Sequence, residues 1–371
     1  MGSNDFDVAV IGAGPAGTTA ANSLAKLGRS VVLFDKAVFP RPSLCAGWLN
    51  SRAESVLHEL NVTDPQLLKT KISDVTFYSA DLAKSARPKL SAPVGFLIDR
   101  RRLDDAMLKA ARTRGITFES DAPVESIRRG ESTVTINLPN GKSHVSRLLI
   151  LACGRDSALV QRMGFASRPG DGPIWCTQVE TPLPRGSAGD PGVAVILGLG
   201  AGASFGFFIR TPEKLVLNVN WMREESAARP ALVELAKVAF ERGLIPVDLS
   251  AVAAKADVVR SPAAAALDME THAGKHTLLI GDAGGFVAAA SNEGIYPAMW
   301  SAQLAAQVVD DALRSTVTQD ALMNFDTIWR TKMADYLRPP QTDIRFLLPL
   351  VFSNQPMADR MGAAFFFGEN M

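Results

Sequence analysis

Apolar residues are almost continuous in two segments near the start of the chain, DVAVI (residues 7–11) and SVVLFD (30–35). Strands that are apolar at every position are typical of a parallel sheet covered on both faces, whereas alternation indicates a half-exposed strand. The residues between the two segments are small and apolar with helical spacing, and they end at Gly28. The pattern therefore predicts a βαβ unit.

Farther along, residues 98–115 have the apolar spacing of an amphipathic helix, and residues 116–120, 122–130, 132–146 and 147–154 predict four strands, with a turn at Asn140-Gly141. Apolar segments between about residues 169 and 258 predict a separate antiparallel sheet, followed by a helix near 228–242. The chain returns to an α/β pattern with HTLLIGD (276–282) and ends in helices from Tyr296 onward.

Composition narrows the possible functions. The 371 residues include 39 basic and 38 acidic side chains, a net charge of +1, which offers no basic field for nucleic acid. Three cysteines, Cys45, Cys153 and Cys176, show no CxxC spacing, so neither a disulfide framework nor a metal site is expected. Without an export signal or a run of eighteen apolar residues, the sequence predicts a cytoplasmic protein with no transmembrane segment.

The first strand runs into a glycine-rich turn. In IGAGPAG, the glycines Gly12, Gly14 and Gly17 have G-x-G-x-x-G spacing, with Pro15 and Ala16 opening the helix. Such a turn lets backbone N–H groups approach a pyrophosphate at the positive end of a helix. An acid, Asp35, followed by Lys36, ends the second strand 23 residues after Gly12, near the spacing of a ribose-binding acid. We therefore predict a dinucleotide site.

A second strand–turn–helix pattern lies about three quarters of the way along the chain. In LLIGDAGGFVAAASNEGIYPAM, Gly281 and Asp282 follow a short apolar strand, and a long Ala-rich helix follows after Gly294 and Ile295. An acid at this position can accept hydrogen bonds from hydroxyl groups or cap a helix, and the small residues allow a ligand to come close.

These stretches, together with VVLFDKAVFPR, IDRRRLDDAML and LLILACGRDSALV, resemble the FAD-dependent oxidoreductases of the p-hydroxybenzoate hydroxylase type. That group includes aromatic-ring hydroxylases, flavin halogenases and geranylgeranyl reductases. The resemblance implies an α/β fold: a Rossmann-like FAD domain of the glutathione-reductase type, an inserted antiparallel β-sheet for the substrate, and C-terminal helices. It assigns residues 1–75, 95–168 and 259–330 to the FAD domain, 76–94 and 169–258 to the substrate sheet, and 331–371 to a C-terminal helical segment.

The resemblance also implies roles for particular residues. Asp282 would contact the ribityl chain of FAD, Arg100 would belong to the FAD site, and the backbone of Gly294 and Ile295 would pass beside the flavin ring. Cys45, in FPRPSLCAG, occupies the place of a Cys-Gly motif of the geranylgeranyl reductases and is a weak catalytic candidate; a small buried cysteine that fills space is the alternative. No other catalytic residue is indicated.

By this resemblance, the sequence favours a flavin monooxygenase that acts on an aromatic or other apolar small molecule through a C4a-hydroperoxide. The alternatives are a geranylgeranyl-reductase-like enzyme that reduces carbon–carbon double bonds, and a flavoprotein that modifies or matures a partner polypeptide. Cys153-Gly154 replaces the Asp-Gly pair of the relatives, which leaves open whether NAD(P)H or a separate flavin reductase reduces the FAD. The sequence has no W-x-W-x-I-P stretch, which disfavours halogenation, and the Tyr-x-Trp-x-Phe-Pro stretch of the prenyl reductases has no clear match.

Two further expectations concern regions without a motif. The histidines His58, His144, His272 and His276 are scattered, and each is predicted to be a surface residue. The C-terminal stretch from residue 344 is rich in Phe, Leu and Met. It could cover the substrate cavity or an apolar partner, but docking of a terminal helix on its own domain is favoured.

Overall fold

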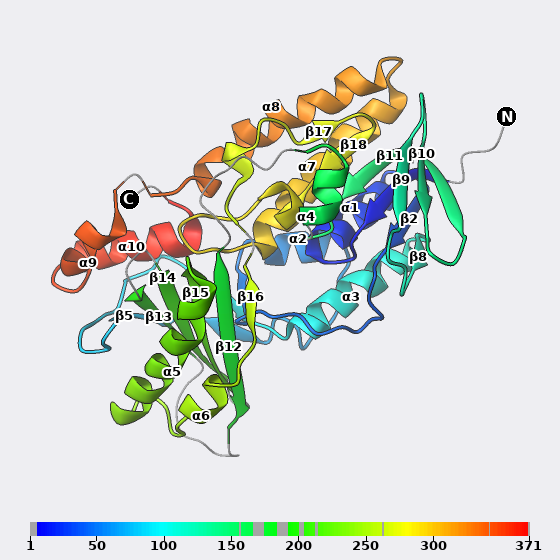
Figure 1. Cartoon of the computed structure of the whole chain (residues 1–371). Coiled ribbons are helices and arrows are strands. Elements are labelled where there is room, and N and C mark those ends of the chain that lie inside the picture. Colours follow the sequence, from blue (N-terminus) through cyan, green and yellow to red (C-terminus); the bar gives the residue numbers. More distant parts are fainter. Residues whose placement is uncertain are drawn as a thin grey trace.

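The computed structural model describes residues 6–155, 157–165, 174–183, 192–199, 204–211, 214–261, 263–340 and 342–369. Parts of the predicted substrate segment, such as residues 184–191 and 200–203, lie outside the described residues. The described chain contains sheets of eight, seven and three strands. Figure 1 shows the eight-stranded sheet with its helices in the upper part of the view and the seven-stranded sheet below.

The eight-stranded sheet contains the predicted βαβ unit. Its parallel strands run in the order β18-β11-β1-β2-β8, and β17, β10 and β9 add antiparallel pairs at its margins. The strands are β1 (Phe6–Ile11), β2 (Val31–Phe34), β8 (Thr117–Glu119), β9 (Ser126–Arg129), β10 (Val134–Asn137), β11 (Ser143–Leu151), β17 (Ala273–Gly274) and β18 (Thr277–Leu279). Because β11 and β18 lie beside β1, segments far apart in sequence complete one sheet.

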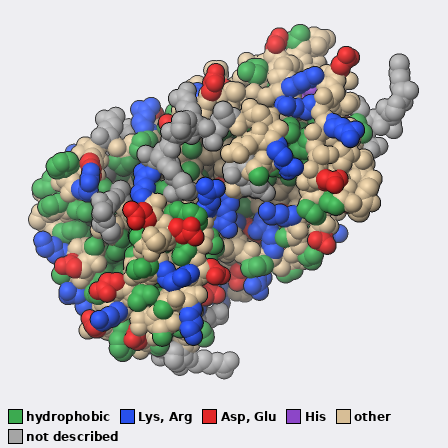
Figure 2. Space-filling model, viewed as in Figure 1, with side chains coloured by type: hydrophobic (Ala, Val, Ile, Leu, Met, Phe, Trp, Pro, Cys, Tyr) green, Lys and Arg blue, Asp and Glu red, His purple; other side chains and the backbone are tan. Residues whose placement is uncertain are grey.

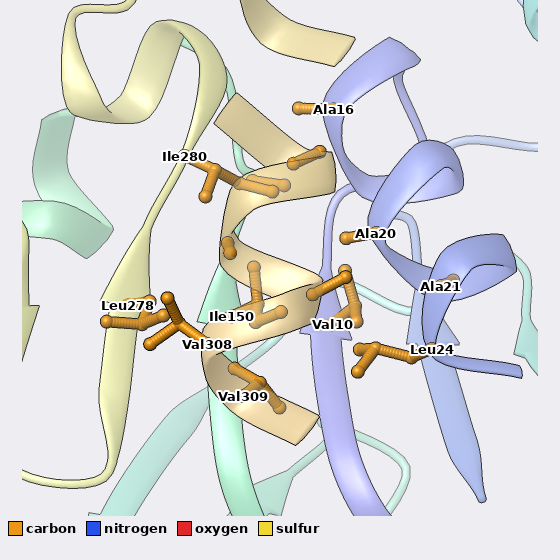
Figure 3. Packing of buried hydrophobic residues seen from close by; sticks show 14 of the residues in the cluster. Val10, Ala16, Ala20, Ala21, Leu24, Ile150, Leu278, Ile280, Val308 and Val309 are labelled. Atoms are coloured by element: carbon orange, nitrogen blue, oxygen red, sulfur yellow. The ribbon is translucent and has the colours of Figure 1, made fainter. Parts of the chain in front are cut away.

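Helices cover this sheet on both faces. They are α1 (Pro15–Lys26), α3 (Arg100–Thr113), α4 (Ser157–Arg162), α7 (Ile295–Arg314) and α8 (Thr318–Leu337). Figure 3 shows α1 and α7 side by side over the strands, with Leu24 and Val309 directed toward Val10 and Ile150. Leu24 is fully buried, and burial of such a side chain contributes about 2 kcal/mol. Small alanines on both helices let them pack closely.

Strand β11 differs from its prediction. The sequence placed a break between residues 146 and 147, but β11 is one nine-residue strand. Its first half alternates between buried and exposed positions because it pairs with β10 in a hairpin, whereas its last four residues are all buried between β1 and β18. The change of pattern marks a change of environment within one strand.

The seven-stranded sheet has the order β16-β12-β15-β14-β13-β5-β6, antiparallel except for the parallel pair β13–β5. Its strands are β5 (Val75–Ser79), β6 (Ser85–Ala86), β12 (Trp175–Pro182), β13 (Gly192–Leu199), β14 (Ser204–Arg210), β15 (Lys214–Met222) and β16 (Val258–Arg260). One face packs on α5 (Glu225–Glu241) and α6 (Ser250–Ala253), and the other on α9 (Ile344–Val351) and α10 (Gln355–Phe367). The predicted separate sheet is confirmed.

A three-stranded sheet, β3 (Trp48–Asn50), β7 (Gly95–Leu97) and β4 (Thr70–Ile72), was not predicted. The helix α2 (Ala53–Glu59) follows β3, and the short 3-10 helices η1 (Ala266–Asp268) and η2 (Gly281–Gly284) precede α7. The strands of this sheet have three residues each, too few for a periodic pattern, and they pair across more than twenty intervening residues.

The C-terminal helices settle one alternative. Phe365 and Phe366 of α10 pack on Phe77 and Trp48, so the favoured expectation of docking on the chain's own domains is confirmed. The division into domains stays a prediction; helix α8 continues across the predicted domain limit at residue 330.

Among the described helices, none is long and apolar enough to cross a membrane. On the face shown in Figure 2, Lys and Arg side chains are interspersed with Asp and Glu, in agreement with the small net charge.

Candidate FAD site

The glycine-rich turn after β1 has no room for side chains. Gly12 has a positive φ of +104°, and a Cβ there would lie 2.2 Å from the carbonyl oxygen of Ala152. A Cβ at Gly17 would lie 1.7 Å from the carbonyl oxygen of Gly12. Pro15 is the first residue of α1, where its missing N–H costs nothing. The turn therefore presents bare backbone at the positive end of α1, as an anion site requires.

Asp35 follows β2 and lies against this turn. Its two carboxylate oxygens accept hydrogen bonds from the backbone N–H groups of Ala13 at 2.8 Å and Ala37 at 2.9 Å. Lys36, next in the chain, is exposed. Each carboxylate oxygen keeps further acceptor capacity, so Asp35 can both hold the turn and bind a hydroxyl group.

Arg41, which the sequence interpretation did not single out, belongs to the same place. Its guanidinium lies 3.8 Å from Asp35, 3.6 Å from Asp104 and 3.5 Å from the position of a Cβ at Gly14. Among the described residues, no hydrogen-bond partner contacts its buried Nε. This Nε is 3.8 Å from Asp35 Oδ2, too far for a hydrogen bond, so it is able to donate to an anion at the phosphate-type turn. Its position in VFPR, a few residues after Asp35, was the available signal.

Arg100 lies on the other side of Asp104. It donates to both Asp104 oxygens at 3.1–3.2 Å, and Asp104 is completely buried. Although burial opposes its charge, the Asp104 carboxylate raises the pKa of Arg100 above its usual range. Arg102, by contrast, pairs with Asp64 at the surface. Of the three consecutive arginines, Arg100 is therefore the one directed into the site.

Cys45 contacts this arginine. Its sulfur accepts a hydrogen bond from the Gly47 N–H at 3.4 Å and lies near enough to the Arg100 guanidinium to interact with it electrostatically. Cys176 of β12 is near enough for an electrostatic interaction with Cys45, and burial raises the pKa of the Cys176 thiol to about 11. Cys45 has a backbone hydrogen bond and a nearby cation on one side, and it packs against the apolar cluster of β3 and α3 on the other, so both predictions for it remain open.

The second fingerprint folds against the first. Gly281 has a φ of +59°, and a Cβ there would lie 2.7 Å from the Cβ of Ala16. Ser301 of α7 accepts the Gly281 N–H at 3.1 Å. The turn that carries Asp282 is therefore fixed beside the start of α1, although more than 260 residues separate them.

Asp282 has some exposed surface, but protein surrounds it on most sides. Burial raises the pKa of its carboxyl to about 6, while Arg100 and Arg155 act in the opposite direction. A Cβ at Gly294 would lie 3.0 Å from Asp282 Oδ1, so a side chain there would have to displace the Asp282 carboxyl by a few tenths of an ångström. Ile295 directs its side chain into the core formed with β3 and α3, which leaves its backbone at the first turn of α7.

Glu293, for which the sequence pattern predicted no role, is buried beside this turn. Its Oε2 accepts hydrogen bonds from Asn50 Nδ2 at 3.2 Å and from the Tyr336 hydroxyl. Among the described residues, none provides a hydrogen-bond partner for Oε1. Burial raises the pKa of the carboxyl to about 7, although Tyr336 and Asn50 favour the ionised form. The spacing NEG within the second fingerprint was the signal for this residue.

The expectation that the histidines are surface residues is wrong for His144 and His272, which are 6% and 0% exposed. His272 lies behind the Asp282 turn, with Nε2 2.7 Å from the Gly284 carbonyl oxygen and Nδ1 3.3 Å from Asp326. Burial works against ionisation of Asp326, but His272 and neighbouring donors lower its pKa to about 2. His272 therefore supports the backbone of the turn and is remote from any reacting group shown here.

A cavity of about 280 Å³ lies elsewhere. It is lined by side chains on the α5-facing side of the seven-stranded sheet, including Tyr78, Ile196, Phe208 and Leu235. None of the residues of the two fingerprints lines it. The cavity is separate from the site described above.

The two fingerprints, Asp35, Arg41 and Arg100 thus form one continuous set of backbone and charged groups. A bare turn at a helix start, an unpartnered arginine donor and an acid at each end fit an elongated ligand with a pyrophosphate in its middle. FAD has this shape. A family model described as "FAD binding domain" matches residues 5–284. The chain belongs to this FAD-binding family. FAD is its cofactor.

Among known proteins, the menaquinone reductase of Mycobacterium tuberculosis is 30% identical over 162 residues, 43% of this chain and 40% of that protein. A digeranylgeranylglycerophospholipid reductase of Methanoculleus marisnigri is 24% identical over 355 residues, 90% of this chain and 84% of the relative. A solved geranylgeranyl bacteriochlorophyll reductase-like protein from Thermoplasma acidophilum superposes with a TM-score of 0.73 at 17% identity, covering 90% of this chain and 85% of that one. The last likeness shows the fold.

Proposed function

We propose that the glycine-rich turn and Arg41 hold the pyrophosphate of FAD, with Asp35 binding the adenosine ribose. Gly12, Gly14 and Gly17 leave room for the phosphates, and Pro15 and Ala16 start the helix whose free N–H groups face them. The unpartnered Nε of Arg41 supports this placement. Lys36 lies beside the ribose site in this arrangement.

At the other end of the cofactor, the Asp282 carboxylate accepts hydrogen bonds from the hydroxyl groups of the ribityl chain. Gly281 lets the Asp282 turn approach Ala16, and Arg100 keeps positive charge near Asp282. The backbone of Gly294 and Ile295 lies beside the flavin ring, where the N–H groups of the first turn of α7 favour negative charge.

For the reaction, we propose reduction of a carbon–carbon double bond in an apolar, isoprenoid-type substrate. Two relatives named above are reductases of menaquinone and of a digeranylgeranyl lipid, and both names refer to molecules with isoprenoid chains. The observation that carries the proposal is the placement of Cys45 between the Gly47 N–H and Arg100, the arginine that also acts on Asp282. In this proposal the Cys45 thiol donates the proton that accompanies the hydride.

Bound FAD supplies the hydride in such a reduction. The chain's own part is to orient the substrate and to provide the matching proton. Phe205 and Phe207 lie on the face of the seven-stranded sheet that packs on Trp48 of β3 and Phe365 of α10, where aromatic side chains keep water away. Arg100 acts electrostatically on Cys45, and two-oxygen hydrogen bonding to Asp104 holds Arg100.

Turnover without oxygen tests this reaction. The holoprotein, reduced with dithionite under anaerobic conditions, is mixed with menaquinone or with a geranylgeranyl lipid. We expect a product with one double bond fewer and re-oxidised flavin. Cys45→Ser should lower the rate by about tenfold or more, the usual contribution of a positioned proton-transfer group, while FAD binding stays unchanged. Product that forms only with consumption of oxygen would contradict the reductase.

An FAD monooxygenase acting on an aromatic or apolar substrate is the second candidate. It is favoured by the segment that corresponds to the prenyl-reductase motif, which here forms β14 and β15 without the Tyr-x-Trp-x-Phe-Pro stretch. In that case, one oxygen molecule should be consumed for each product formed, and the anaerobic reaction should give none.

A further inference from the structure

Glu293 is a buried carboxylic acid that the FAD-binding residues above do not require. It is 6% exposed and lies directly before Gly294, where α7 begins. Three separate parts of the chain meet around it. Asn50 comes from β3, Tyr336 from α8, and Asn50 Nδ2 also donates to the Phe366 carbonyl oxygen of α10 at 2.9 Å.

The groups that face Glu293 leave its charge poorly compensated. Tyr336 and Asn50 are neutral donors, and the backbone N–H of Tyr296, at the start of α7, also favours the ionised form. Arg52 acts on the carboxyl from a distance, because its guanidinium lies over the Tyr336 ring, 5.2 Å from the centroid. A second acidic residue, Asp282, lies on the far side of Gly294, and Arg100 and Arg155 are near it.

The two oxygens of Glu293 are bonded unequally. Oε2 has two side-chain donors, whereas Oε1 is buried and has no hydrogen bond of normal geometry to the described residues, although the backbone N–H of Tyr296 lies near the carboxyl. Buried polar atoms in native proteins nearly always have a partner. Because burial raises the pKa of this carboxyl to about 7, both the acid and the carboxylate are populated at neutral pH.

We propose that Glu293 is the proton partner of the flavin: it takes up one proton when the bound FAD is reduced and gives it back when the flavin is re-oxidised. The inference rests on the proposed position of the flavin ring beside Gly294. It does not depend on which substrate re-oxidises the flavin.

The reason is the repulsion between two buried negative charges. Two electrons and one proton convert FAD into its anionic reduced form, which would lie beside an ionised Glu293 in a poorly solvated place. Like charges at short range repel each other, so reduction of the flavin raises the pKa of Glu293. The carboxylate then takes up a second proton. In the reverse direction, the hydride leaves the flavin with both electrons, and Glu293 loses its proton to the product or to water. The electrons come from dithionite in the test below, and from a reduced nicotinamide or a reductase protein in catalysis.

The pH dependence of the flavin's midpoint potential tests this directly. The holoprotein is titrated anaerobically with dithionite and redox dyes between pH 5.5 and 9. Just above neutral pH, where Glu293 is ionised beside oxidised FAD and protonated beside reduced FAD, we expect uptake of two protons for every two electrons. Glu293→Gln should take up one proton over the same interval. Glu293→Asp should restore the second.

Two further variants complete the design. Tyr336→Phe keeps the carboxyl but removes a donor to its ionised form, so the steep interval should move to higher pH. Glu180→Gln, at an exposed position of β12, should behave like the parent protein. Equal proton uptake by the parent, Glu293→Gln and Tyr336→Phe would overturn the proposal. If Glu293→Gln fails to retain FAD, the Tyr336→Phe result decides. The double-bond reductase is tested by products and oxygen use, so the two proposals can fail independently.

Discussion

The acids of the candidate site differ in what surrounds them. Asp104 lies between two arginines, Asp35 accepts two backbone N–H groups, and Asp282 and Glu293 are pushed toward their neutral forms by burial. A buried group whose charge is poorly compensated lowers stability unless a ligand uses it. Replacing either acid by a neutral residue should therefore raise the stability of the apoprotein and weaken cofactor binding.

Asp282→Asn tests this opposition. Loss of a charged acceptor for the ribityl hydroxyls should weaken FAD binding about 10- to 100-fold. The measurement is a fluorescence titration of apoprotein with FAD. Asp335→Asn, at a position that is 83% exposed, is the control and should bind like the parent. Unchanged affinity of Asp282→Asn would remove this residue from the site.

The same variant should stabilise the apoprotein. In the folded chain, Asp282 keeps its proton up to a pKa of about 6, whereas in the unfolded chain it ionises near 3.8. The folded state thus binds more protons in this window, and stability falls as pH rises from about 4 to 6. Above pH 6, Asn should raise the free energy of unfolding by about 1–3 kcal/mol, and the gain should shrink below pH 4. Urea unfolding at pH 4 and pH 8 measures it; a gain that does not change with pH would contradict the assignment.

Local elements were predicted where the chain's own spacing determines them. The βαβ unit, the G-x-G-x-x-G turn and the amphipathic α3 follow from periodicity and glycine positions. The three-stranded sheet, and Arg41 and Asp104 as partners of the predicted Arg100, were missed because each depends on partners brought together by folding. The spacing of residues along the sequence predicts local elements. It does not predict a contact such as that between Asn50 and Glu293, which are 243 residues apart.

The turn before α1 offers a matched comparison. Gly12 and Gly28, on either side of this helix, both have positive φ. At Gly12 a Cβ would lie 2.2 Å from a carbonyl oxygen, whereas at Gly28 none of the described atoms lies within 4 Å. Both alanine variants should lose about 1 kcal/mol of stability from the backbone conformation. Only Gly12→Ala should also bind FAD at least about tenfold more weakly, since the phosphate turn must shift. Calorimetric titration with FAD measures the affinity; similar affinities for both variants would contradict a phosphate role of the turn.

On the scale of the whole molecule, the FAD-type sheet is assembled from distant segments, with the seven-stranded sheet inserted between them in sequence (Figure 1). The late position of the Asp282 turn predicted this interruption, and β18 beside β11 is in agreement with it. What sequence alone could not supply is the set of contacts that closes the unit. One of these is a buried ion pair between Arg29, after α1, and Asp310 in α7, with Nε 2.6 Å from Oδ1.

This ion pair permits a test of how tightly the two distant parts are joined. Asp310 is 1% exposed and also pairs with Arg314, so Arg29→Met leaves a buried carboxylate with one partner instead of two. Removing one partner of a buried pair is strongly destabilising, and with Arg314 still present we expect a loss of about 2 kcal/mol in the free energy of unfolding. Arg345→Met breaks an exposed pair with Asp343 and should cost less than about 1 kcal/mol. Urea unfolding of both variants with bound FAD gives the comparison. If Arg29→Met is no less stable than Arg345→Met, the N-terminal unit and α7 are held together by apolar packing of α1 on α7 alone; if it loses FAD as well, closure of the interrupted sheet and formation of the cofactor site are one cooperative event.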